Sequence, residues 1–525
     1  MHRYRCGAVI ILFLFLAGCA GLRPASEYSR TASFALPDPE ETRLGRWLAP
    51  EIAAHPGKSG FILLPNPIEA FRMRAALAES AERTMDVQYF LIRGDDTGRL
   101  LLETFVRAAD RGVRVRLLVD DFNLSGEDLD ILALDAHPNI EVRLFNPFSF
   151  RMWGFRMMDL IFHLDRLKRR MHNKSFIVDN TMVIVGGRNL ADEYFNAKAD
   201  YVFRDLDVLG VGPVAKEVSE RFDDYWNSTM AYPVSSFLPS WVEPRVLPRV
   251  LEKLRKHWEE MKSSDFGRSM NEVGSLRDLL ERHFPLIWAP ADVIADAPEK
   301  LLPQETRVSS PPAAALGSLA SRAKEEIIFI TPYFVLKQRG VDFLRTLRNR
   351  GIRVRVLTNS LASIDELAAH GGYAYRREVL LEEGVELYEL KPVPDRRRRQ
   401  RSFGSSPARF GLHIKAYVFD RQDVMIGSIN LDPRSALLDT QITLIIHSGE
   451  LAQRVASFFD NAAKPATSYH LVLERKESDS NSSSKVVWVT EKEGKEIRYE
   501  DEPEVNFWRR LKASLLSLLP IEDDL

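Results

Sequence analysis

The feature that most constrains this chain is an internal repeat. The stretch HNKSFIVDNTMVIVGGRN runs from His172 to Asn189, and HIKAYVFDRQDVMIGSIN runs from His413 to Asn430. Both read H-x-K, four residues, D, six residues, G-[GS]-x-N, at an offset of 241 residues. A second pair, RAADRGVRVRLL at 107–118 and RTLRNRGIRVRVL at 345–357, lies at an offset of 239. Two independent features at nearly one offset predict a duplicated unit.

Each copy alternates strand-like and helix-like segments. In the first copy, residues 85–91 and 113–120 read as strands on either side of an amphipathic helix over 98–112. The second copy repeats this order over 326–358. Because strands alternate with helices, we expect an α/β fold. At 525 residues the chain is long enough for two such domains.

The repeat and its surroundings divide the chain into six parts. We expect a signal segment over 1–18, a tether over 19–58, a first domain over 59–235, a helical connector over 236–310, a second domain over 311–470 and a C-terminal extension over 471–525.

The extension contains a Ser-rich linker, a short hairpin and an amphipathic helix. That helix carries Phe507, Trp508, Leu511 and Leu515 with basic residues among them. It can pack on the body of the protein or lie in a membrane interface.

The N-terminus has the pattern of a secretory signal. Arg3 and Arg5 precede GAVIILFLFL, an apolar run of 10 residues that is too short for an ordinary membrane span. Residues 16–19, LAGC, resemble the lipobox of bacterial lipoproteins, which implies that Cys19 is acylated and becomes the mature N-terminus. The alternative is a signal in which this cysteine is incidental. A mature chain starting at Cys19 has one cysteine and no internal disulfide.

These N-terminal residues predict a location. We expect a lipid-anchored protein of the bacterial cell envelope that faces the periplasm. Ala20 is not the aspartate that retains lipoproteins in the inner membrane of enteric bacteria, so the outer membrane is favoured by analogy. The formal charge of −2 gives no electrostatic reason to bind nucleic acid.

The doubled motif predicts phosphodiester chemistry. Residues i and i+2 of a strand face one side, so His172 projects with Lys174 and His413 with Lys415. The turn-like residues after each run predict hairpins whose return strands bring back Asn189 and Asn430.

Small residues in the return strands, among them Gly187 and Ser428, let a ligand approach the backbone closely. Lysines and asparagines across a shared cleft offer positive charge and donors to a phosphate diester. One neutral histidine can attack phosphorus, and a protonated one can supply the leaving group's proton. This chemistry needs no metal or other cofactor.

The motifs resemble those of the phospholipase D superfamily over residues 60–470. RRMHNKSFIVDNTMVIVGGRNLADEYF, FRDLDVLGVGP and the closing FW..L..LLSLLPIE look like the C-type bacterial cardiolipin synthases. The resemblance implies duplicated domains, each a mixed sheet flanked by helices, that pack about a pseudo-twofold axis with the active site between them. It also implies transfer of a phosphatidyl group to phosphatidylglycerol, with phosphatidylethanolamine as a further candidate substrate.

The resemblance also assigns roles to residues. His172 is implied to be the nucleophile and His413 the acid/base, with Lys174 and Lys415 on the phosphate. Asp179 and Asp420 belong to the motif, but their place at a turn favours structural support.

In the family an acid after each motif binds the histidine's other nitrogen. Asp205 fits the first motif, whereas Gln441 stands where glutamate is usual after the second. A neutral amide cannot balance an imidazolium, so we expect the acid/base step to be affected.

Alternatives to a phosphatidyltransferase remain open at this level. A phospholipase D hydrolase would use the same residues with water as acceptor. A nuclease or other phosphodiesterase is disfavoured by the anchor and by the neutral charge, and a non-catalytic lipid-binding lipoprotein is encouraged only by Gln441.

Overall fold

The computed structural model describes residues 28, 30–124, 131, 133–149, 153–197, 201–236, 243–264, 266–268, 276–282, 285–302, 310–393, 409–476 and 483–517. The signal segment over 1–18 and Cys19 lie outside these residues. Within the described ranges, no helix combines the length and the apolar character that a bilayer span requires.

The first sheet has nine strands in the order β10-β1-β8-β6-β5-β2-β3-β4-β9. Strands β2, β3 and β4 are parallel, and the other neighbours are antiparallel, so the sheet is mixed. Its strands are β1 (Ser59–Leu64), β2 (Thr84–Tyr89), β3 (Arg114–Asp120), β4 (Ile140–Phe145), β5 (Ser175–Val178), β6 (Met182–Gly186), β8 (Asp207–Val211), β9 (Ala231–Pro233) and β10 (Ile287–Ala289).

The second sheet has ten strands in the order β11-β18-β17-β16-β12-β13-β14-β19-β20-β21. Its strands are β11 (Ala291–Ala295), β12 (Glu326–Ile330), β13 (Arg353–Asn359), β14 (Glu386–Leu390), β16 (Ala416–Phe419), β17 (Asp423–Gly427), β18 (Ile442–His447), β19 (Ser468–Lys476), β20 (Ser483–Lys492) and β21 (Lys495–Tyr499). From β18 to β14 the order matches that from β8 to β4, with the parallel strands at equivalent places.

Helices flank both sheets in equivalent positions. Helices α3 (Pro67–Ser80) and α4 (Asp96–Asp110) pack on the first sheet as α14 (Gln338–Asn349) does on the second. The longest equivalent pair is α9 (Pro213–Trp226) and α19 (Gly449–Ala462). The α/β class with two copies of one unit is therefore confirmed.

The structure describes further helices around these. They are α2 (Arg43–Ala54), α6 (Trp153–Phe162), α7 (Leu164–Leu167), α8 (Asp192–Phe195), α10 (Glu243–Lys262), α12 (Leu276–Arg282), α13 (Pro311–Arg322), α15 (Leu367–Ala374), α16 (Arg377–Glu382), α18 (Pro433–Leu437) and α20 (Phe507–Ser517).

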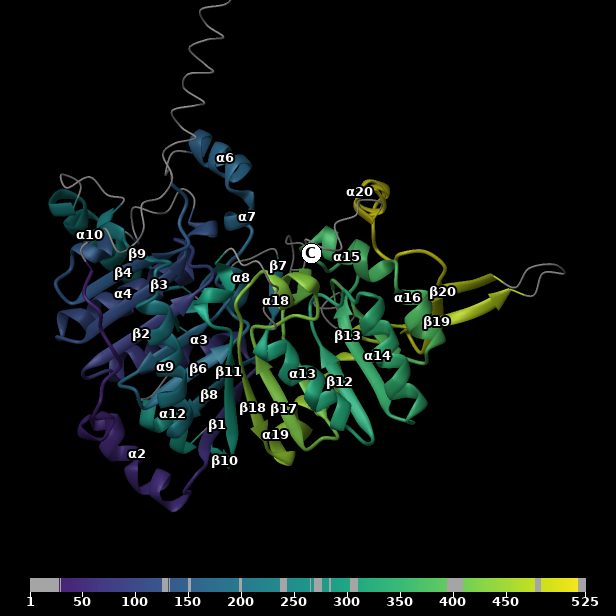
Figure 1. Cartoon of the computed structure of the whole chain (residues 1–525), viewed down its shortest axis with the longest axis horizontal. Helices are drawn as coiled ribbons and strands as arrows, with labels where there is room; N and C mark the ends of the chain where they lie inside the picture. Colours follow the sequence, from purple (N-terminus) through teal and green to yellow (C-terminus); the bar gives the residue numbers. More distant parts are fainter. Residues whose placement is uncertain are drawn as a thin grey trace, which may run out of the picture.

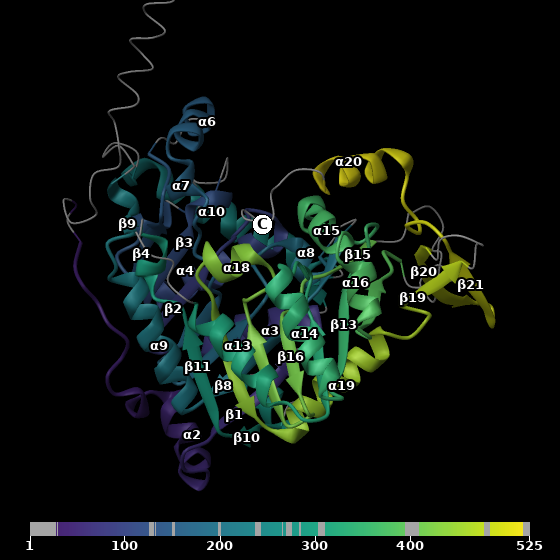
Figure 2. The same ribbon diagram turned by 45° about the vertical axis from the view of Figure 1, so that its right-hand side comes forward.

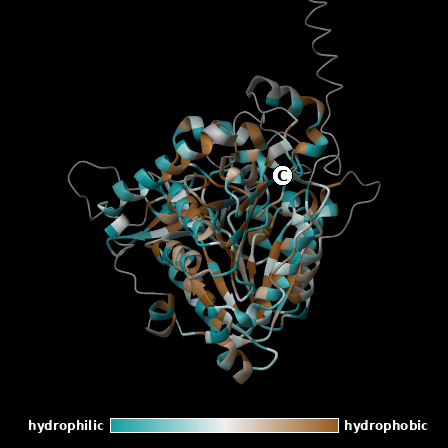
Figure 3. Ribbon diagram, turned by 90° about the vertical axis from the view of Figure 1, so that its left-hand side faces the viewer, coloured by the Kyte–Doolittle hydropathy of each residue, from teal (hydrophilic) through white to brown (hydrophobic). Residues whose placement is uncertain are grey.

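The two halves lie side by side and share one hydrophobic core (Figure 1). A single cluster of buried apolar side chains contains Val183 and Val218 of the first half with Leu444 and Val455 of the second. Figure 3 shows hydrophobic strands inside and hydrophilic helix surfaces outside. Because apolar burial drives folding, this shared core holds the halves in one arrangement.

The segment over 236–310 is more than the predicted helical connector. Besides α10 and α12 it contains β10 and β11, separated by Pro290. Strand β10 pairs with β1 in the first sheet, and β11 pairs with β18 in the second. The segment therefore joins the two sheets by adding one edge strand to each.

Candidate active site

Each motif forms a hairpin with the histidine and lysine just before its first strand. The hairpins are β5–β6 and β16–β17. Lys174 donates from Nζ to the carbonyl oxygen of His172 at 2.6 Å, and Lys415 does the same to His413 at 2.5 Å. Both histidines and both lysines are buried, so each pair is held in one conformation at the end of its sheet.

The chain before each histidine pairs with the opposite half. Strand β15 (Arg409–Leu412) runs parallel to β7 (Tyr201–Arg204), and the amide of His413 donates to the carbonyl of Arg204 at 2.8 Å. The equivalent bridge joins Met171 to Thr440, and the amide of His172 donates to the carbonyl of Thr440 at 3.0 Å. The same pairing thus occurs twice with the halves exchanged, as a pseudo-twofold arrangement requires.

This pairing explains which group supports which histidine. The residue after Arg204 is Asp205, and the residue after Thr440 is Gln441. Asp205 Oδ2 lies 2.7 Å from His413 Nδ1, and Gln441 Oε1 lies 3.0 Å from His172 Nδ1. Each support therefore comes from the opposite half. The expectation that Gln441 acts on the acid/base histidine is wrong, because Gln441 lies against His172.

The small residues of the return strands make room for these supports. A Cβ on Gly187 would lie 2.4 Å from Oδ1 of Asp205. At the equivalent place, Ser428 donates from Oγ to Gln441 Oε1 at 2.7 Å, and its carbonyl lies 3.1 Å from His172 Nδ1. Gly187 is therefore needed for the approach of a carboxylate, whereas the expectation was the approach of a ligand.

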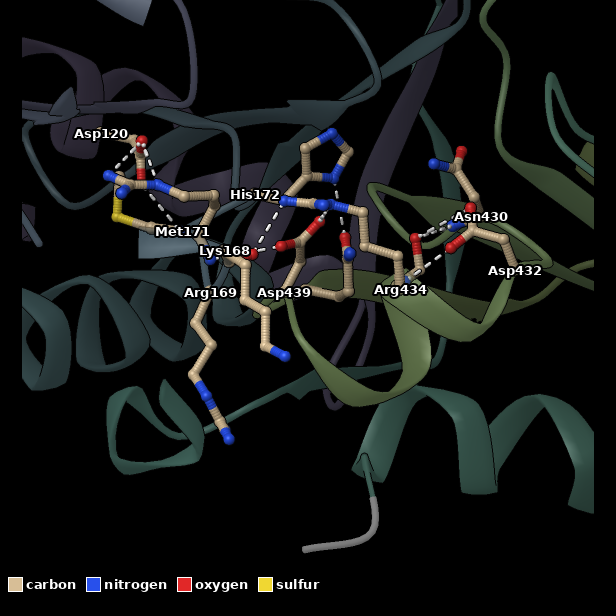
Figure 4. Close-up of polar contacts among 12 residues, drawn as sticks. Asp120, Lys168, Arg169, Met171, His172, Asn430, Asp432, Arg434 and Asp439 are labelled. Carbon is tan, nitrogen blue, oxygen red and sulfur yellow. Dashed lines mark hydrogen bonds and ion pairs between the residues drawn. The ribbon is translucent and has the colours of Figure 1, made fainter. Parts of the chain in front are cut away.

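Two further polar residues fix the chain beside the histidines. Asp120, at the end of β3, accepts the amide of Met171 at 2.9 Å (Figure 4). It also pairs with Arg170. Asn359, at the end of β13, accepts the amide of Leu412 at 2.8 Å. Sequence reasoning missed both, although the offset of 239 residues relates them.

Aspartates 179 and 420 lie away from the histidines. The Asp179 carboxylate accepts the amides of residues 82–84, at the start of β2, at 2.8–2.9 Å. The Asp420 carboxylate accepts those of residues 324–326, at the start of β12, at 2.8–3.1 Å. Both sit at turn positions with φ near 50°. Although both belong to the motif, each has a structural role and not a catalytic one, since each ties the tip of its hairpin to the neighbouring strand.

Aromatic rings enclose the histidines unequally, and sequence spacing did not single them out. His413 contacts the rings of Tyr194 and Phe203, with centroids 5.2 and 4.9 Å away. His172 contacts Phe90 at 5.2 Å. Asn189 donates from Nδ2 to the hydroxyl of Tyr194 at 2.9 Å, so it belongs to the same cluster.

The asparagines retain unused acceptors. The Oδ1 atoms of Asn189 and Asn430 are buried with no hydrogen-bond partner in the described part of the chain. The backbone amide of Asn430 donates to Ser435 Oγ at 3.4 Å. A buried acceptor without a partner is costly, so each of these oxygens is available to accept a hydrogen bond from a ligand.

Burial and the lysine charges disfavour the protonated form of both histidines. Burial lowers the pKa of His172 well below its ordinary value, and Lys174 and Lys415 lower it further. Burial lowers the pKa of His413 in the same way, again with both lysines contributing. Burial raises the pKa of Asp205 to about 7. Because Asp205 Oδ2 lies 2.7 Å from His413 Nδ1, the two groups can share a proton.

The two lysines form an anion-binding feature. Burial lowers the pKa of Lys415 to about 8 and that of Lys174 well below its ordinary value, and Lys415 adds to the lowering at Lys174. The Nζ hydrogen bonds found for these lysines in the described residues go to carbonyl oxygens, and no ion pair with a carboxylate is present there. Buried cations are costly unless paired, so the site is built to receive an anion.

Comparisons with known proteins agree with this geometry. A family model described as "Cardiolipin synthase, PLD-like domain" matches residues 75–226 and 316–463. Cardiolipin synthase C of Escherichia coli K12 is 39% identical over 481 residues, covering 91% of this chain and 99% of that protein. Cardiolipin synthase B of the same organism is 22% identical and covers 72% of this chain and 74% of that protein.

A solved structure shows the same fold. The phosphatidylserine synthase of Haemophilus influenzae Rd KW20 superimposes with a TM-score of 0.52 at 13% identity, covering 78% of this chain and 86% of that chain. With both copies of the family model matched and with a relative similar over nearly its full length, the chain belongs to the cardiolipin synthase family with PLD-like domains.

Proposed function

We propose that this protein is a phosphatidyltransferase that makes cardiolipin by moving a phosphatidyl group to phosphatidylglycerol through a phosphohistidine. The observation that carries the proposal is a pair of buried lysines beside two histidines from opposite halves, and among the residues that the structure describes neither lysine pairs with a carboxylate. A phosphate diester carries one negative charge, and this charge can pair with the two lysine ammonium groups. The similarity to cardiolipin synthase C of Escherichia coli supports the choice of substrate.

His172 is the nucleophile in this mechanism. Its Nδ1–H donates to Gln441 Oε1 and to the carbonyl of Ser428, which leaves the lone pair on Nε2. Gln441 is neutral and does not favour an imidazolium, so His172 stays unprotonated and reactive. Nε2 attacks phosphorus, the N–P bond forms, and the bond to the leaving alcohol breaks.

His413 supplies the proton. The Asp205 carboxylate at 2.7 Å stabilises a positive charge on His413, which Gln441 does not do for His172. A bound phosphate also offsets the lysine charges that lower the pKa of His413. His413 gives its Nε2 proton to the leaving alcohol and then takes one from a hydroxyl of phosphatidylglycerol. That hydroxyl attacks phosphorus, the N–P bond breaks, and cardiolipin forms.

Product analysis tests the reaction. Purified protein is incubated with labelled phosphatidylglycerol, alone and with phosphatidylethanolamine. Diphosphatidyl product supports the proposal and identifies the donor, whereas phosphatidate alone indicates a hydrolase. The absence of any product from either mixture contradicts the assignment of an enzyme.

Trapping the intermediate tests the roles of the histidines. His172→Ala is expected to abolish turnover and adduct. His413→Ala is expected to be slower by about 10²–10⁴-fold on a natural lipid, since it lacks the proton donor. On a diester with a nitrophenol leaving group it should recover the first step and accumulate adduct on the peptide that contains His172. Adduct on His413 in His172→Ala would reverse the roles.

We further propose that the protein is a lipoprotein anchored through Cys19, facing the periplasm, with the outer membrane favoured. The support is the apolar run of 10 residues, whose last residue is the first of LAGC. Cys19→Ser is expected to lose metabolic labelling with palmitate and to be released from membranes. Unchanged labelling in this variant would contradict the anchor.

A further inference from the structure

Exposed apolar side chains are concentrated in two helical regions. Among the described residues, twelve large apolar side chains are exposed, and eight of them lie in α6, α7 and α20. The first four are Met157, Ile161, Phe162 and Leu164, and the other four are Phe507, Trp508, Leu511 and Leu515. Ile161 is 71% exposed and Trp508 is 68% exposed. Apolar side chains clustered in this way mark a surface for contact with another body.

Helices α6 and α7 lie at the edge of the first sheet that carries His172. They follow the carboxyl end of β4 and lead directly into Arg170, which pairs with Asp120 at the carboxyl end of β3. The next residues of the chain are Met171 and His172. The apolar surface of α6 and α7 is therefore joined to the catalytic segment by a short stretch of chain.

Helix α20 lies at the equivalent edge of the second sheet. Arg509 donates from Nε to the carbonyl of Leu361 at 2.8 Å and from a second nitrogen to the carbonyl of Ile364. Both carbonyls belong to the loop that follows β13. The last residue of β13, Asn359, accepts the amide of Leu412, which is next to His413 in the chain. These contacts hold α20 on the body while its apolar side chains face outward.

The two helical regions stand on the same side of the molecule. In Figures 1 and 2, α6 and α20 both stand above the sheets at the top of the molecule, on either side of α8 and α18. The two views agree although the molecule is turned by 45° between them. A flat surface that contacted both helices would therefore face the edge at which the active site lies.

Basic residues accompany the apolar ones. Within its described bounds, α20 has three basic residues, Arg509, Arg510 and Lys512, and no acidic residue. Residues 164–170, LDRLKRR, have four basic residues and one acidic residue; Arg170 is buried against Asp120, whereas Lys168 and Arg169 are half-buried. Figure 4 shows the side chains of Lys168 and Arg169 directed away from His172. Apolar side chains with basic neighbours are the composition that binds anionic lipid surfaces.

We propose that α6, α7 and α20 form a two-point docking surface that seats the active-site edge on a bilayer containing anionic lipid. This inference rests on the proposed function, because a phospholipid substrate must leave a bilayer to reach the histidines. The surface acts separately from the N-terminal anchor. The anchor would keep the protein near the membrane, whereas the docking surface sets the orientation of the catalytic edge.

Depth measurement tests the docking. The full chain with Cys6 changed to Ser is the starting protein. In it a single cysteine replaces either Ile161 or Leu515, and this cysteine is labelled with an environment-sensitive fluorophore. Glu51→Cys on α2 is the control position, and the chain without an added cysteine reports any label on Cys19. The vesicles contain phosphatidylglycerol and phosphatidylcholine with a nitroxide on the acyl chain. We expect quenching at 161 and 515 and none at 51. No quenching at 161 and 515, or shielding of these positions by a second protein chain without vesicles, would contradict the proposal.

Kinetics supply the second test. We expect the double variant Ile161→Glu and Leu515→Glu to lose about tenfold or more of its rate on vesicles, because charged side chains replace two membrane contacts. It should keep its rate on short-chain phosphatidylglycerol below the micellar concentration. Phe34→Glu is the matched control, because Phe34 is exposed and its carbonyl accepts Arg114 at the amino end of β3, opposite the catalytic edge.

The outcomes separate the two proposals. An equal loss on both substrates would show that the helices act through the fold and would overturn the docking surface. If the unmodified protein converts neither substrate, the proposed function fails, and the depth measurement still decides whether the surface binds lipid.

Discussion

Replacing Gln441 by glutamate puts a negative charge beside His172 and adds no contact to His413. Gln441 Oε1 lies 3.0 Å from His172 Nδ1, and Gln441 Nε2 has no hydrogen-bond partner in the described residues. Exchanging that nitrogen for oxygen therefore breaks no hydrogen bond seen here. The shape of the side chain is also kept, so the change is mainly electrostatic.

The size of the effect follows from the geometry. Opposite unit charges about 4 Å apart attract by about 4 kcal/mol at an effective dielectric constant of about 20. Burial of the new carboxylate offsets part of this, so the pKa of His172 should rise by about 1–3 units. Because the nucleophile must be neutral, a higher pKa moves the acidic limb of the kcat/KM profile to higher pH by the same amount. The basic limb, which reports the proton on the pair of Asp205 and His413, should stay in place.

Asp205→Asn is the matched opposite change. It removes the charge 2.7 Å from His413 Nδ1 and should lower the pKa of His413. The basic limb then moves to lower pH, and kcat on a natural lipid falls by about 10²–10⁴-fold. Both profiles are measured with cardiolipin formation as the readout. If Gln441→Glu moves the basic limb and leaves the acidic limb unchanged, Gln441 supports the proton donor and the assigned roles are wrong.

Three further changes test other parts of the site. Asp179→Ala should lower the free energy of unfolding by about 2–5 kcal/mol, measured with urea, because three backbone amides lose their acceptor, while the folded protein keeps its kcat. Gly187→Ala should lower kcat as Asp205→Asn does, since the new Cβ would lie 2.4 Å from the carboxylate; Gly317→Ala, with no atom within 4 Å of its Cβ, is the control, and equal activities would contradict the crowding. Activity should survive EDTA, because ammonium and imidazole groups supply the charge stabilisation; loss that a divalent ion restores would refute this.

The fold class and the core of the site could be predicted from local sequence patterns. The pairing of His172 with Lys174 and of His413 with Lys415 follows from the i, i+2 geometry of an extended chain. The hairpins follow from turn chemistry, and Asp179 and Asp420 occupy the left-handed turn positions that aspartate tolerates. The doubled motif then predicted two equivalent domains, because a repeated sequence folds into a repeated unit.

The pairing between the halves was decided only by the tertiary structure. Met171 pairs with Thr440, and Leu412 pairs with Arg204, across more than 200 residues, and no local pattern encodes these contacts. These contacts place Gln441, the neutral residue where a glutamate is usual, against His172. The missing carboxylate therefore affects the proposed nucleophile and not the proposed acid/base, His413.

The same limit applies to the connector and to the surface. No local pattern places β10 and β11 in different sheets, because strand pairing is set by long-range packing. Helix α20 is recognisably amphipathic in sequence, but it stands on the same side of the molecule as α6 only because the shared core sets the two halves side by side.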